Sequence, residues 1–454
     1  MATPCGDLRK KCPFAIVSPL NVGFNTIECA IGRWVVAMRV QIKNLGVIKE
    51  ADFEVGDLTI ICGINNTGKT YVNYALYGFL DFWWNAAIPK IENMEEIKKS
   101  SKDEMDAFSQ LSQEKNAIVA NAIKEYAGVF PVAFASTKLG GSSFSVDIST
   151  KELNNAGINN SLRARFRDGA ILNDETPEDI QAGLVIKQSF TPFLPNPFAI
   201  TAERSGILNL WGELDMPDDP WNPNGKRRHG ESTIPLPIQR NIDFVRMSKN
   251  GRFRTESPLL NDFPDFLDDF KNLFGGTYKV HEGVIYFVPE GSNATELRMQ
   301  EGSSSVRALF HLNYYLRYIA QEGDILMIDE PELNLHPERQ RLMARLLARL
   351  VNVGIKVFLT THSDYLIREL NVLIMLYRKE ERLEKIRNEE GYRENELLEA
   401  DKVRVYTAEQ TKEGNGYTLC LADVNQTNGI EVSTFDKTIV QSSSIIENIV
   451  YGIS

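Results

Sequence analysis

The chain has 454 residues, of which 43% are hydrophobic, and a formal net charge of −11. This length can bury a large core and predicts two or three domains or lobes. The acidic balance excludes a general attraction to nucleic acid, and the five scattered cysteines exclude a disulfide framework or a zinc cluster. Because no apolar run approaches the roughly 20 residues of a membrane-spanning helix, we expect a cytoplasmic protein without membrane contact.

The regular pattern of the chain begins at Met38. Residues 1–37 have weak periodicity, and the sequence leaves open whether this N-terminal extension is native. Residues 38–85 are expected to form the N-terminal part of the core and to contain the first motif.

That motif is a glycine-rich turn, Gly63-Ile-Asn-Asn-Thr-Gly68-Lys69-Thr70, after the apolar run Leu58–Cys62. It fits the P-loop pattern GxxxxGK[ST] between a predicted strand and a helix predicted over Tyr71–Leu80. Backbone N–H groups at such a helix start bind phosphate, Lys69 adds a charge, and the Thr70 hydroxyl can ligate Mg²⁺. The alternative, a turn without a ligand, is disfavoured by this context. The candidate nucleotide-binding residues are Gly63, Asn65, Asn66, Thr67, Gly68, Lys69, Thr70 and Tyr71.

Residues 86–300 are more than a compact core requires, so we expect an insertion that includes some core strands. Residues 92–128 have a charged, helical pattern typical of a lid or arm. Residues 226–254 are locally basic, and two interpretations stay open: a patch that contacts nucleic acid, or a solvated loop region. The basic residues are Lys226, Arg227, Arg228, Arg240, Arg246, Lys249, Arg252 and Arg254.

Two elements follow in residues 301–377. A helix is predicted to start at Ser303, Ser304 and Ser305, where its N–H groups and the hydroxyls can meet an anion. The apolar strand Ile325–Ile328 then carries Asp329 to its end, where the carboxylate can hold Mg²⁺ through water. Glu330, next to it, is placed to polarise an attacking water.

A strand–helix–strand pattern completes this region. Pro337 starts a helix with an apolar stripe, and the buried strand Val357–Leu359 leads to His362. In parallel α/β proteins, ligand groups gather at the carboxyl edge of the sheet. We therefore favour His362 as a γ-phosphate contact over a core histidine. The remaining residues 378–454 are predicted to form a charged helix and C-terminal β-hairpins.

Four segments, GINNTGKT, EGSSSVRAL, LMIDEPELNLHP and FLTTHSDYL, carry a family resemblance. The chain resembles ABC-type ATPases of the RecF/SMC/OLD-like branch (AAA family ATPases) and is most similar to stand-alone ATPases of bacterial anti-phage systems such as PARIS or Septu. The resemblance implies an α/β, ABC-type P-loop NTPase core: a mostly parallel sheet flanked by helices with an antiparallel β edge. It also implies a large, mainly helical insertion between Walker A and the signature helix.

The same resemblance implies a composite site for ATP and Mg²⁺ in a homo-oligomer, at least a dimer. Lys69, Glu330 and His362 would be catalytic in cis, and Thr70 and Asp329 would hold the metal. Ser303, Ser304 and Ser305 would act in trans from the signature helix, while Pro331–Pro337 would be the D-loop and His362 the H-switch.

Two departures from the family pattern leave questions open. The chain has Gly302-Ser-Ser-Ser305 where an LSGGQ-like signature is usual, so the serine that contacts phosphate is not identified. No clear Q-loop glutamine is present, and Ala202–Ser205 fills that region. Arg204 there either reaches the nucleotide or a partner, or forms a structural salt bridge.

The expected activity is hydrolysis of ATP to ADP and phosphate, without nuclease activity of its own, since neither Toprim-type acids nor an HNH-like histidine cluster is recognisable. The expected role is the sensor and scaffold subunit of an anti-phage defence system, controlling a separately encoded effector such as a nuclease or toxin. The alternative is a RecF-like DNA repair or maintenance ATPase that clamps DNA in an ATP-dependent dimer. A transporter subunit fits poorly because of the insertion and the D-loop.

Overall fold

The computed structural model of the chain describes residues 36–88, 104–135, 141–150, 194–210, 234–291 and 295–431, together with Lys90, Leu139 and Ser444. Among these residues, one large sheet has the strand order β4-β1-β2-β12-β11-β3-β10-β9-β5. Its strands are β1 (Val36–Leu45), β2 (Ile48–Val55), β3 (Leu58–Cys62), β4 (Ser143–Thr150), β5 (Pro197–Ile200), β9 (Ile325–Asp329), β10 (Lys356–Thr361), β11 (Val403–Gln410) and β12 (Tyr417–Leu421).

The sheet has a parallel centre and an antiparallel edge. Strands β11, β3, β10, β9 and β5 pair in parallel, whereas β1 pairs antiparallel with both β2 and β4. Every residue of β3 and β9 is buried, as expected for parallel strands that are covered on both faces. This architecture confirms the predicted fold class.

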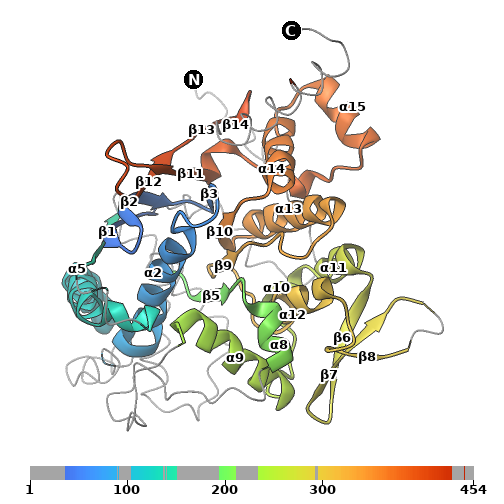
Figure 1. Cartoon of the computed structure of the whole chain (residues 1–454), viewed down its shortest axis with the longest axis horizontal. Helices are drawn as coiled ribbons and strands as arrows, with labels where there is room; N and C mark the ends of the chain where they lie inside the picture. Colours follow the sequence, from blue (N-terminus) through green and yellow to red (C-terminus); the bar gives the residue numbers. More distant parts are fainter. Residues whose placement is uncertain are drawn as a thin grey trace, which may run out of the picture.

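The two faces of the sheet pack against different helices (Figure 1). Ile61, Met327 and Phe358 point to one face, where they join the core formed with helix α2 (Lys69–Phe82). Their neighbours, including Ile60 and Leu359, point to the other face and join the core formed with helices α12 (Ser304–Tyr318), α13 (Pro337–Asn352) and α14 (Asp364–Leu376). The helix that follows the P-loop and the helix that follows the three serines therefore cover opposite faces.

The expected insertion is interwoven with this core. Its strands β4 and β5 form the two outer edges of the sheet, and Pro197 starts the edge strand β5, where a missing N–H is tolerated. The other elements are α5 (Glu104–Val129), α8 (Arg204–Leu210), α9 (Leu236–Lys249), α10 (Pro258–Asp262), α11 (Phe266–Phe274) and a small sheet of β6 (Gly276–His281), β7 (Val284–Pro289) and β8 (Leu297–Arg298). Short π and 3₁₀ segments lie at Trp83–Ala87 and Phe130–Phe134.

The C-terminal part contributes to the sheet as well. Strand β11 lies beside β3, and β12 returns antiparallel to join β2. The charged run 378–399 contains a shorter helix than its pattern predicts, α15 (Glu381–Glu389), which stops before Gly391, where φ is +69°. The remaining segments are the 3₁₀ turns Glu394–Glu396 and Ala400–Lys402 and the hairpin of β13 (Asp423–Asn425) and β14 (Gly429–Glu431).

A buried carboxyl at the start of β9 makes stability depend on pH. Asp324 lies beside the Tyr315 hydroxyl (3.5 Å) and accepts from Gln321 N (3.2 Å), and burial raises its pKa to about 7. Because this folded-state pKa exceeds the unfolded value of about 4, the folded state binds more protons between these limits and loses stability as pH rises through them.

We therefore expect Asp324→Asn to become progressively more stable than the wild type as pH rises from about 4 to about 7. Urea unfolding of both proteins across this range measures the difference. If the difference in the free energy of unfolding between the two proteins stayed constant with pH, Asp324 would not have a raised pKa in the folded state.

Candidate nucleotide site

The glycine-rich turn joins β3 to α2 in a conformation that needs its glycines. Gly63 and Gly68 have φ values of +146° and +87°. A Cβ at Gly68 would lie 2.6 Å from Ile48 Cγ1, so another side chain does not fit there. Asn66 also has a positive φ, which asparagine tolerates, and it is exposed with Asn65 at the crest of the turn. The turn thus presents its backbone to solvent at the start of a helix.

Two side chains fix the turn from within. Thr67 is buried, and its hydroxyl donates to Ile64 O at 2.9 Å. Lys69 Nζ donates to Gly63 O (2.9 Å) and Ile64 O (2.8 Å). Burial lowers the pKa of Lys69, while the nearby Glu330 and Asp329 carboxylates act in the opposite direction. The Lys69 ammonium therefore lies beneath the exposed residues of the turn, near the Glu330 and Asp329 carboxylates.

Tyr71 follows Thr70 on α2 and is partly exposed. Its ring packs edge-on to Phe134, with 5.6 Å between centroids, and lies against the turn between β1 and β2. A Cβ at Gly46 in that turn would lie 2.3 Å from the Tyr71 ring. Tyr71 is thus adjacent to the glycine-rich turn and is held by packing.

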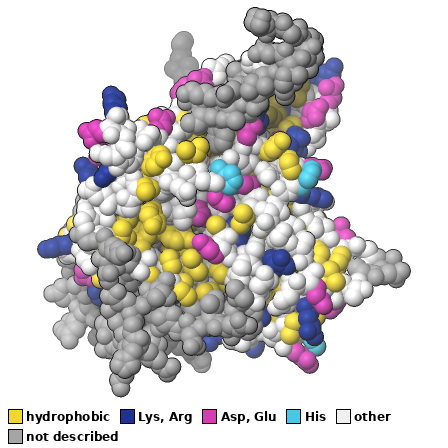
Figure 2. All heavy atoms as spheres, in the orientation of Figure 1, with side chains coloured by type: hydrophobic (Ala, Val, Ile, Leu, Met, Phe, Trp, Pro, Cys, Tyr) yellow, Lys and Arg dark blue, Asp and Glu magenta, His cyan; other side chains and the backbone are white. Residues whose placement is uncertain are grey.

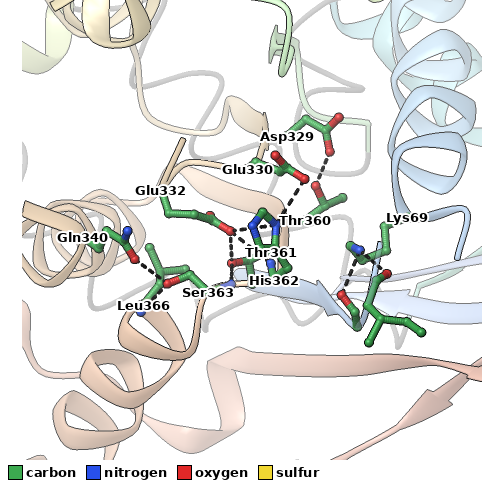
Figure 3. A network of polar contacts seen from close by, with 12 residues as sticks. Lys69, Asp329, Glu330, Glu332, Gln340, Thr360, Thr361, His362, Ser363 and Leu366 are labelled. Carbon is green, nitrogen blue, oxygen red and sulfur yellow. Dashed lines mark hydrogen bonds and ion pairs between the residues drawn. The ribbon is translucent and has the colours of Figure 1, made fainter. Parts of the chain in front are cut away.

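Asp329 ends β9 directly beside this turn. Its Oδ2 accepts from Thr70 Oγ1 at 2.9 Å. Figure 3 shows its other contact, in which Oδ1 accepts from the Thr360 hydroxyl on the paired strand β10. Burial raises the pKa of Asp329 to about 6, and the two hydroxyl hydrogen bonds oppose the rise. The Thr70 hydroxyl and the Asp329 carboxylate form a pair of oxygen ligands that fits Mg²⁺, which binds oxygen and usually keeps several waters.

Glu330 leaves the strand in an unusual backbone conformation. Its φ is +52°, a region that costs energy for a residue with a Cβ, while its N–H still donates to Thr360 O at 3.0 Å. This turn directs the carboxylate toward His362, whose Nδ1 lies 3.2 Å from Glu330 Oε1 (Figure 3). Such strain at a residue that carries an acid is typical of a functional site.

His362 lies just beyond β10 at the surface. Its side chain is 43% exposed, compared with 25% for Glu330. Figure 2 shows acidic and histidine side chains together near the middle of the face in view. The pair is therefore accessible to a ligand from solvent.

The three serines lie elsewhere. Ser303 caps α12 by accepting from Val306 N at 3.3 Å, and its hydroxyl is 2.8 Å from that of Ser305. Ser303 and Ser304 are exposed. Helices α12 and α2 cover opposite faces of the sheet. Among the described residues of one chain, no hydrogen bond joins these serines to Lys69, Thr70, Asp329 or Glu330.

Arg204 has a role that neither sequence-based interpretation anticipated. Its buried guanidinium donates to four backbone carbonyls: Ala308 O (3.0 Å), Thr201 O (3.0 Å), Asp329 O (2.8 Å) and Glu330 O (2.5 Å). Burial lowers its pKa to about 10. These bonds replace the expected salt bridge or nucleotide contact, and they tie α12 to the end of β9. The sequence held no local signal for this role.

The basic stretch 226–254 is described only from residue 234 onward, so Lys226, Arg227 and Arg228 lie outside the described residues. Arg240 pairs with the buried Asp81 at 2.9 Å. Lys249 is half-buried, and burial lowers its pKa to about 8. These two residues belong to the packed structure, whereas Arg252 and Arg254 are exposed, so a nucleic-acid contact by this stretch stays a prediction.

The described residues contain no cluster of three or more His, Cys, Asp or Glu side chains arranged to hold a metal. The Thr70–Asp329 pair differs from such a cluster, since Mg²⁺ in nucleotide sites takes few protein ligands. Within the same part of the chain, every helix is too short or too polar to cross a membrane.

The strand–turn–helix motif, the acidic strand end and the sheet order are those of a P-loop NTPase fold. A family model described as AAA ATPase domain matches residues 240–367, a span that includes α12, β9 and His362. Over this span the chain is therefore similar to AAA ATPase domains. No curated protein matches the sequence.

Three solved structures are distantly similar. The SMC head bound to the C-winged helix domain of ScpA shares 10% identity, with 85% of this chain and 97% of that chain covered and a TM-score of 0.36. The SMC head domain from Thermotoga maritima has 10% identity, coverages of 86% and 99%, and a TM-score of 0.31. The Smc head with an extended coiled coil, bound to the C-terminal domain of ScpA derived from Pyrococcus furiosus, has 8% identity, coverages of 90% and 99%, and a TM-score of 0.31.

Proposed function

We propose that the chain binds and hydrolyses Mg²⁺-ATP between two copies of itself. The observation that carries the proposal is the convergence of five side chains from three strand ends. Lys69 and Thr70 follow β3, Asp329 ends β9 and Glu330 follows it, and His362 follows β10. Contacts of 2.9 Å between Thr70 and Asp329 and 3.2 Å between Glu330 and His362 join four of these side chains in two pairs.

The proposed mechanism assigns one task to each group. The N–H groups of the turn and Lys69 bind the phosphates, with phosphate oxygens replacing the carbonyls that Lys69 now contacts. Thr70 and Asp329 hold Mg²⁺, which neutralises developing charge on the phosphates when it is bound. Glu330 accepts a proton from the attacking water, and His362 contacts the γ-phosphate.

The second copy of the chain would bind the phosphates of ATP through the serines at the start of α12. Ser303 and Ser304 are exposed at the N-terminus of α12, where backbone N–H groups and the positive end of the helix dipole favour an anion. Because α12 and α2 lie on opposite faces of the sheet, the serines of one chain would meet the P-loop of another. ATP binding would then close a dimer, and hydrolysis would reopen it.

Lys69→Ala is expected to weaken ATP binding roughly 10- to 100-fold, since one charge-assisted hydrogen bond is worth about 1.5–3 kcal/mol. Calorimetric titration with Mg²⁺-ATP measures this change. Lys43→Ala is the matched control, because Lys43 forms an exposed ion pair with Glu50 on β1 and β2. Equal affinities of the Lys69 variant and the wild type would contradict the assignment of the P-loop.

For the cellular role, we propose a sensor and scaffold subunit that controls a separate effector, supported by the motif resemblance to stand-alone defence ATPases. The test is the mass of the protein with the product of its genomic neighbour, with and without ATP, using Glu330→Gln to retain the nucleotide. A partner-loaded assembly that changes with ATP supports this role. A homodimer that ignores the neighbour but retains duplex DNA would replace it with the DNA clamp.

A further inference from the structure

We propose that Glu332 is a positioning residue for hydrolysis. Its carboxylate contacts the backbone N–H and the ring of His362 and keeps the ring in place while Glu330 accepts a proton from the attacking water. The inference rests on the proposed ATPase function and adds a second carboxylate to its machinery. Glu332 lies in the loop between β9 and α13, two residues after Glu330.

The side-chain contacts of Glu332 with described residues are made to Thr361 and His362. Its Oε1 accepts from Thr361 Oγ1 at 2.7 Å and from His362 N at 3.0 Å (Figure 3). The same oxygen lies 3.5 Å from His362 Nδ1. One carboxylate oxygen therefore fixes the end of β10, the backbone of His362 and the position of its ring.

The burial of Glu332 is unusual for a residue whose task is only packing. Its side chain is 4% exposed, and Oε2 has no hydrogen-bond partner among the described residues. A buried carboxylate oxygen without a partner costs free energy, so apolar residues normally take such positions. An acid retained there at this cost indicates a task in the site that it faces.

The two carboxylates share one ring nitrogen. Nδ1 of His362 lies 3.2 Å from Glu330 Oε1 and 3.5 Å from Glu332 Oε1. An ionised carboxylate can only accept a hydrogen bond, so Nδ1 is attracted to either acid when it carries a hydrogen. When Glu330 turns to accept the proton of the attacking water, its 3.2 Å contact with Nδ1 is lost. Glu332 then remains as the carboxylate beside Nδ1 and keeps the ring oriented.

The two glutamate side chains differ in how strongly their surroundings restrain them. Glu330 is 25% exposed and has one side-chain contact to His362, whereas Glu332 is almost fully enclosed and accepts two further hydrogen bonds. Glu330 is thus the acid that can move, and Glu332 the one that stays.

The test compares Glu332→Ala with Glu332→Gln in the full-length protein. We expect kcat for ATP hydrolysis to fall about 10- to 100-fold in the alanine variant, the usual loss when a supporting partner is removed, with unchanged affinity for ATP. The glutamine variant retains an oxygen acceptor at Oε1 and should keep most of the activity. Glu322→Ala, an exposed glutamate at the opposite end of β9, is the control.

A double-mutant cycle separates positioning from simple stabilisation. In a His362→Ala background, Glu332→Ala should reduce kcat by less than about twofold, because the ring it orients is gone. Independent, multiplicative losses would overturn the inference, as would wild-type kcat in Glu332→Ala. If Glu332→Ala does not fold, Glu332→Asp replaces it, because the shorter side chain moves the carboxylate away from His362 by one methylene. A wild-type kcat in Glu332→Asp would also overturn the inference. Absence of phosphate release by the wild type would instead remove the proposed function itself.

Discussion

Replacing Glu330 by glutamine is expected to lower kcat for ATP hydrolysis by about 10²- to 10³-fold while ATP still binds. The amide has the size of the carboxyl group, so the strained backbone at φ +52° and the N–H bond to Thr360 are preserved. It cannot accept the proton of the attacking water. Phosphate release and calorimetric binding of ATP, measured on the same preparation, separate the two effects.

The control for this variant is Glu322→Gln, which makes the same chemical change before β9, at an exposed position. Its kcat should equal that of the wild type. If Glu330→Gln retained wild-type turnover, another group would be the base, and the geometry around His362 would need a different explanation.

Arg204→Ala is expected to reduce the free energy of unfolding by about 3–5 kcal/mol, the range for removing one side of a buried charged interaction. The guanidinium serves four carbonyls from three segments: the turn after β5, helix α12 and the end of β9. Without it these carbonyls stay buried and lose their donor. Arg204→Lys keeps the charge but has three N–H groups on one atom, so we expect an intermediate loss.

Urea unfolding measures these losses, with Arg368→Ala as the matched control. Arg368 pairs with Asp364 on the surface of α14 at 2.6 Å and is 53% exposed, so its removal should change stability by no more than about 1 kcal/mol. An Arg204→Ala variant as stable as the Arg368 variant would show that the four hydrogen bonds do not hold the site together.

Local chemistry explains which parts of the site could be predicted from the sequence. The P-loop pattern specifies its own turn, since Gly63 and Gly68 adopt backbone conformations that disfavour other residues. Likewise, the apolar run Ile325–Ile328 followed by two acids identifies a strand that ends at the site. In both cases, neighbouring residues along the chain determine the geometry.

Glu332 and Arg204 could not be assigned in this way because their roles depend on contacts that are distant in sequence. Arg204 meets residues more than 100 positions away, and Glu332 meets residues 29 and 30 positions away. The edge strands pose the same problem. Only the assembled sheet shows that β4 and β5 form its two edges.

The central claim, that ATP is held between two copies of this chain, is tested most directly by the molar mass of Glu330→Gln in solution, measured by light scattering with and without Mg²⁺-ATP. If ATP closes a dimer, the mass roughly doubles with ATP and returns to the starting value when ATP is removed. A variant that binds ATP but keeps the mass of a single chain at every protein concentration would contradict the composite site.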